Sequence, residues 1–124
     1  MSTKDYNALI SIHLQEFGLP LYKGRGYLKQ IVRRYVEKAL SEEPINYNQL
    51  VAEVAAEKGV RPDSVKDAIQ RFVKSYWECG FCSGWKTYTG WDQDYPPNSN
   101  TAIQLICESF LPIMRKYQDT IQSG

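Results

Sequence analysis

Few side chains in the sequence are suited to catalysis or metal binding. The chain has one histidine, His13, and three cysteines, two of which form a Cys-x-x-Cys motif at residues 79–82. A zinc site needs about four ligands, and only Cys107 and His13 remain to complete one. A redox pair would need a βαβ setting, which the pattern does not predict. We therefore expect no metal, no cofactor and no catalytic residue, and a protein that is not an enzyme.

Basic side chains could instead bind phosphate, and the most basic region of the chain lies between residues 23 and 38. This segment contains a single acid, Glu37. The net charge of the chain is only +1, so any basic surface must come from local clustering of this kind. The alternative, which fits the sequence equally well, is that these cations form a solvated helix face with no binding role.

The chain is long enough for one domain with its own core. Its 124 residues are 43% hydrophobic and 23% charged, which is typical of a globular protein. No stretch approaches the roughly 20 apolar residues of a membrane-spanning helix, and no signal peptide stands at the start. With an odd number of cysteines, we expect a cytoplasmic protein with reduced thiols and no membrane partner.

Apolar residues recur at helical spacing and predict an all-α domain over residues 1–124, with about six helices and no winged-helix strands. The predicted helices cover residues 4–17, 27–40, 47–58, 62–78 and 100–117, and a short one lies in the loop 79–97. His13 falls on an apolar face, as a hydrogen-bonded core histidine would. Residues 23–26 are expected to form a connector. Pro112 is expected to bend the last helix or to split off its final turn.

The segment from residue 47 to residue 78 has the pattern of a helix-turn-helix. Ala55, Gly59 and Val65 occupy the positions where that motif needs a close helix crossing, a sharp turn and a packed start of the second helix. Val54, Val60 and Ile69 are expected to supply the remaining contacts. A plain helical hairpin with no role in DNA binding is the alternative.

In such a motif the second helix enters the major groove of DNA. The candidate base contacts are Arg61, Ser64, Lys66, Asp67, Gln70 and Arg71. The candidate phosphate contacts are Lys23, Arg25, Lys29, Arg33 and Lys74. Asp63 and Asp67 would be repelled by phosphates, and both also suit the positive end of a helix.

Large rings recur along the loop 79–97. The rings are those of Phe81, Trp85, Tyr88, Trp91 and Tyr95. Only one cation, Lys86, lies among them. The rings therefore favour a small apolar cluster that holds the loop in place, rather than a platform on which single-stranded bases stack.

Short segments spread along the chain, taken in order, resemble the sequence of one protein family. From about His13 to Leu111 the chain resembles the C-terminal effector domain of the stage 0 sporulation protein A family of response regulators. The matching pieces are Gly18-Leu19-Pro20, Lys23-Gly24, Tyr27-Leu28, Ile45, Leu50 to Ala55, Val65 with Ala68-Ile69, Trp77 with Gly80, and Pro97-Asn98-Ser99.

The resemblance implies a six-helix domain that binds specific duplex DNA, pairs as copies on tandem sites and controls transcription without a cofactor. The family's effector domain follows a phosphorylated receiver domain, which these residues do not supply, so phosphorylation control would be absent or would come from a partner protein. The family's base-contacting Arg-x-Glu-Arg residues are replaced by Ser64, Lys66 and Asp67. Two interpretations fit these replacements: a regulator with a different DNA target, or a protein-interaction module that has lost specific DNA binding.

Overall fold

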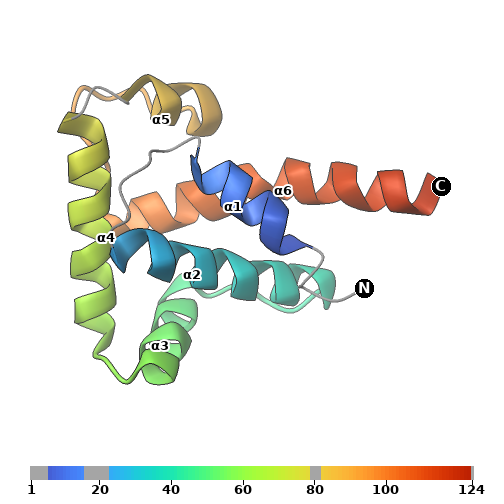
Figure 1. The fold of residues 1–124 in the computed structure, drawn as a ribbon, viewed down its shortest axis with the longest axis horizontal. Coiled ribbons are helices and arrows are strands. Elements are labelled where there is room, and N and C mark those ends of the chain that lie inside the picture. Colours follow the sequence, from blue (N-terminus) through green and yellow to red (C-terminus); the bar gives the residue numbers. More distant parts are fainter. Residues whose placement is uncertain (1–5, 16–22, 79–81, 124) are drawn as a thin grey trace.

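The computed structural model describes residues 6–15, 23–78 and 82–123, and within these ranges the chain forms six helices and no strand (Figure 1). The helices are α1 (Asn7–Gln15), α2 (Lys23–Leu40), α3 (Tyr47–Lys58), α4 (Pro62–Tyr76), α5 (Cys82–Thr89) and α6 (Ser99–Ser123). The predicted all-α class without winged-helix strands is confirmed for this part of the chain.

Helix α2 lies at the centre of the fold and contacts α1, α3, α4 and α6. In Figure 1, α2 and α6 run beside each other, and α4 stands across the ends at which both begin. The predicted apolar stripe of α2 is buried, from Leu28 through Ile31, Val32 and Tyr35 to Val36. Burial of this stripe holds the helix in place, because most of the stability of a helix in a protein comes from packing of its apolar face.

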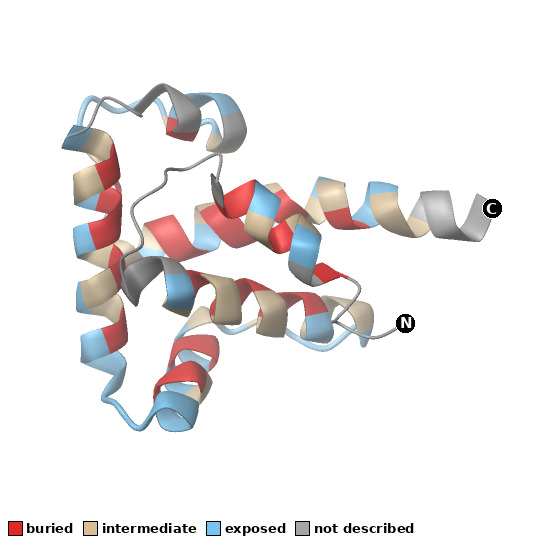
Figure 2. Ribbon diagram, viewed as in Figure 1, coloured by how far each residue is buried: buried red, intermediate tan, exposed pale blue. Residues whose placement is uncertain are grey.

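The buried side chains of the helices form one core (Figure 2). Helix α6 contributes Ile103, Ile106, Phe110 and Met114, which recur at helical spacing. From α5, Trp85 reaches this core and is fully buried. Helix α6 therefore packs against the inner face of α4, and the other face of α4 points outward.

Helix α2 begins at Lys23, so the predicted connector at residues 23–26 is wrong. Glycine lowers helix propensity by only about 1 kcal/mol relative to alanine, and packing of the following turn outweighs a penalty of that size. Leu28 in that next turn is fully buried. The predicted helix was too short because its start was placed after the two glycines, whereas the chain is already helical through them.

Helix α6 continues through Pro112 to Ser123, so Pro112 does not split off the final turn, and the helix extends past its predicted end at residue 117. Proline removes one backbone hydrogen bond from a helix. Here Pro112 is exposed, while Phe110 and Met114 on either side are buried and fix the helix before and after it. The ring of Tyr117 also packs edge-on against that of Tyr6, with 5.1 Å between centroids.

The remaining boundaries agree with the pattern to within a few residues. Helix α3 spans the predicted range 47–58, and α4 ends at Tyr76 with a wider turn at residues 77–78. The predicted loop 79–97 contains one short helix, α5, as expected. Helix α1 covers residues 7–15 of the predicted range 4–17, and the outer ends of that range lie outside the described residues.

Candidate nucleic-acid interface

Helices α3 and α4 are joined by a turn of three residues, Gly59 to Arg61. The side chain of Asn46 caps α3 by accepting a hydrogen bond of 3.1 Å from the backbone N–H of Gln49. At the other end Gly59 adopts a left-handed conformation with φ 67°, and Val60 donates its N–H to the carbonyl of Ala55 at 3.0 Å. This is the sharp turn that Gly59 predicts.

The inner side of this helix pair is apolar and closed. Ala55 and Val65, the two packing positions of the pattern, are both buried, and so are Val54 and Ile69. Val60 differs from its prediction, since 36% of its surface is exposed. It is the middle residue of the turn and belongs to neither helix.

The outer side of α4 carries most of the candidate base contacts. Arg61, Ser64, Asp67 and Arg71 are exposed, and within the described part of the chain none of them forms an ion pair. Asp63 is exposed on the same helix. The surface therefore presents donors and acceptors of both charges from the start of α4 to Arg71.

Two of the predicted DNA contacts on α4, Gln70 and Lys74, interact with other residues of the protein. The side-chain amide of Gln70 accepts from the N–H of Ser99 at 2.7 Å and donates to the carbonyl of Pro97 at 3.4 Å. Lys74 lies 4.0 Å from Glu78, one turn away. Gln70 is thus tied to the start of α6, whereas the exposed Lys74 pair is easily broken because such pairs contribute little.

Lys66 lies against α3. Its Nζ donates a hydrogen bond of 3.3 Å to Oδ1 of Asn48, in the first turn of that helix. Asn48 was not singled out in the sequence, because only the crossing of the two helices brings positions 48 and 66 together.

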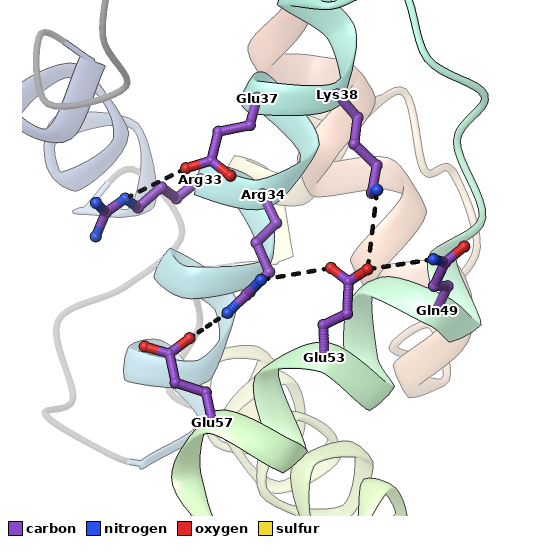
Figure 3. A network of polar contacts seen from close by, with 7 residues as sticks. All are labelled: Arg33, Arg34, Glu37, Lys38, Gln49, Glu53 and Glu57. Carbon is purple, nitrogen blue, oxygen red and sulfur yellow. Dashed lines mark hydrogen bonds and ion pairs between the residues drawn. The ribbon is translucent and has the colours of Figure 1, made fainter.

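Two cations of the basic segment of α2, Arg34 and Lys38, are paired with acids of α3 (Figure 3). Arg34 forms ion pairs with Glu57 and with Glu53, the latter at 3.4 Å, and Lys38 lies 3.8 Å from Glu53. The hydrogen bond from Arg34, together with its charge, lowers the pKa of Glu57 from its ordinary value. These cations attach α3 to α2 and do not form an open basic surface.

Arg33 and Lys29 remain as predicted phosphate contacts on α2. Arg33 is partly exposed and lies 4.0 Å from Glu37 in the same helix. Lys29 is partly exposed and forms no ion pair with any other described residue. Lys23 and Arg25 lie in the first turn of α2, and their side chains are outside the described part of the structure.

His13 is a core residue, as its apolar helix face predicts. It is 3% exposed, and its Nε2 lies 2.8 Å from Oγ of Ser109 on α6. Cys107 is also buried, and burial raises the pKa of its thiol. Among the described residues no group of histidines, cysteines or acids is placed to hold a metal ion. Cys79 lies outside these residues, as does the side chain of Cys82.

The aromatic residues of the loop divide between core and surface. Trp85 is buried and packs edge-on against Tyr76, whereas Tyr95 is 60% exposed. Trp91 lies between these extremes, and its indole N–H donates to the carbonyl of Tyr95 at 2.8 Å. Trp85 therefore belongs to the main core, whereas Trp91 and Tyr95 pack edge-on against each other with 5.9 Å between ring centroids. The side chains of Phe81 and Tyr88 are outside the described residues.

None of the described helices is both long and apolar enough to span a membrane. No protein-family model, no curated protein and no solved structure shows a significant match to the chain.

Proposed function

We propose that α3 and α4 form a helix-turn-helix, and that the protein binds specific duplex DNA as a transcription regulator. The observation that carries the proposal is the α3–α4 turn. Gly59 is in a left-handed conformation, Ala55 and Val65 are buried at the helix crossing, and α4 turns an exposed polar face outward. The resemblance to sporulation effector domains, which bind as copies on tandem sites, favours the same activity.

The base contacts in this proposal come from the exposed face of α4. Arg61, Lys66 and Arg71 supply donors that suit the O6 and N7 acceptors of guanine, and Asp67 supplies an acceptor that suits the N4 donor of cytosine. Gln70 is left out of this set because both ends of its amide are bonded within the protein.

Phosphate contacts are assigned to side chains that can leave their present partners at little cost. Arg33 and Lys74 each take part in an exposed pair of 4.0 Å, which contributes at most about 1 kcal/mol. Lys29 has no ion-pair partner among the described residues. Contacts of this type orient a protein on DNA without reading its sequence.

Selection of bound duplexes from a random pool, at low and at near-physiological salt, tests the proposal. We expect an enriched motif that survives the higher salt. Lys66→Ala should relax the preference at one position, whereas Arg33→Ala should weaken all duplexes alike and flatten the salt dependence. Lys86→Ala, an exposed charge on α5, serves as the control. Binding without enrichment, lost as salt rises, would contradict specific regulation.

A protein-interaction module on the same fold is the second candidate. It is favoured by the net charge of +1 and by the acids that pair with the cations of α2. The exposed Asp63 and Asp67 on α4 favour it as well. The burial of Trp85 counts against one version of it, in which Trp85 and Trp91 form a large exposed apolar patch. Absence of duplex binding at low salt would favour this candidate.

A further inference from the structure

We propose that Asn48 is a positioning residue for Lys66, and that the hydrogen bond between them helps to set which base pair α4 prefers. The inference rests on the proposed binding of DNA through α4. The two residues lie on different helices, 18 positions apart, and the bond joins Nζ of Lys66 to Oδ1 of Asn48 at 3.3 Å.

Lysine benefits from such a partner because its side chain is long and flexible. Fixing a lysine on binding costs much conformational entropy. A hydrogen bond that already exists in the free protein restricts the side chain before DNA arrives, so less entropy is lost in the complex. The ammonium group has three donors, and Asn48 takes one of them. Two donors remain for the adjacent acceptors of a guanine edge.

The chemistry of Asn48 suits this role. Its amide oxygen is neutral, so it holds Lys66 without cancelling the charge that attracts DNA. Asn48 also lines a shallow pocket of about 270 Å³ whose other residues are uncharged, namely Asn46, Tyr47, Asn100, Thr101 and Gln104. The carboxylate of Glu108 adjoins this pocket on the side of α6, where it accepts hydrogen bonds from Tyr47 and Gln104.

Asn48 has little structural work within α3. The helix cap is supplied by Asn46, and Asn48 itself is exposed. Alanine has a higher helix propensity than asparagine, so Asn48→Ala should leave the fold and its thermal stability intact. A change in DNA preference caused by this variant can then be assigned to Lys66.

The test measures the binding of wild type, Asn48→Ala, Lys66→Ala and the double variant. Each is titrated with the selected duplex and with duplexes that carry single base-pair changes. Asn48→Ala should weaken the selected duplex about two- to tenfold. The loss should fall at the same base pair at which Lys66→Ala loses discrimination, and the double variant should match Lys66→Ala alone. Gln49→Ala is the control, since Gln49 is exposed and bonds to Glu53 within α3.

The possible outcomes separate this inference from the proposed function. An unchanged base preference in Asn48→Ala, or additive losses in the double variant, would overturn the role of Asn48 while DNA binding by α4 stood. A wild-type protein that selects no motif would overturn both, because there would be no preference for Asn48 to set.

Discussion

The side-chain amide of Gln70, in the middle of α4, binds the backbone at the start of α6. Its Oε1 accepts a hydrogen bond of 2.7 Å from the N–H of Ser99, and its Nε2 donates to the carbonyl of Pro97. The first N–H groups of a helix have no partner within it. Asn98 satisfies a second of these groups by accepting from Thr101 at 2.9 Å. Gln70 thus links α4 to the helix that supports it.

Gln70→Ala should therefore lower stability and leave base preference unchanged. The variant leaves a partly buried N–H and carbonyl without partners, which costs about 1–3 kcal/mol. Urea unfolding measures this loss. Gln104→Ala, which removes an exposed bond to Glu108 within α6, should change stability by less than about 0.5 kcal/mol. A relaxed base preference in Gln70→Ala would instead restore Gln70 as a base contact.

Two glycine substitutions should shift stability in opposite directions. Gly59 has φ 67° and open space where a Cβ would stand, so Gly59→Ala meets no clash and its cost comes from the backbone alone. That cost is about 1–2 kcal/mol. Gly26 lies within α2 and is equally open, so Gly26→Ala should stabilise the protein by up to about 1 kcal/mol. Thermal or urea unfolding of both variants checks the signs. Equal effects would contradict the left-handed turn.

Acid should weaken the attachment of α3 to α2. The pKa of Glu57 is lowered in the folded state, chiefly by its hydrogen bond from Arg34. A carboxyl group with a lowered folded pKa stabilises the protein above its unfolded pKa, near 4.5, and this contribution is lost as the pH falls through the folded pKa.

As the pH falls below about 5, into the range in which carboxyl groups titrate, Glu57→Gln should consequently lose less stability than wild type. Urea unfolding across this range measures the difference, and added salt should reduce it. Glu43→Gln, at an exposed position, is the matched control. A parallel pH dependence in wild type and Glu57→Gln would show that the ion pair with Arg34 does not contribute.

The hydroxyl of Ser109 fixes the tautomer of His13. Ser109 donates its one hydroxyl proton to the carbonyl of Ile106 at 2.8 Å, so its oxygen accepts from Nε2–H of His13. NMR of the imidazole nitrogens should find the proton on Nε2. Ser109→Ala should cost about 1–3 kcal/mol because it leaves the donor of a buried histidine without this acceptor. A proton found on Nδ1 alone would reverse the direction of the bond.

Local sequence signals predicted the elements where those signals do not compete with packing. Helix α3 has the predicted bounds because Gly59 ends it by its own backbone conformation. The inward face of α6 follows from periodicity alone. The start of α2 and the end of α6 were mispredicted because packing of Leu28 and Met114 outweighs the unfavourable propensities of glycine and proline.

The sequence by itself determined the all-helical class, the turn at Gly59 and the polar character of the outer face of α4, since these depend on neighbours within a few residues. Only the tertiary structure decided which polar groups on that face remain available. Gln70 bonds to a residue 29 positions away, and Lys66 bonds to one 18 positions away. Arg34 is likewise neutralised by α3. These partners are set by how the helices cross, and that crossing is fixed by the shared core to which every helix contributes.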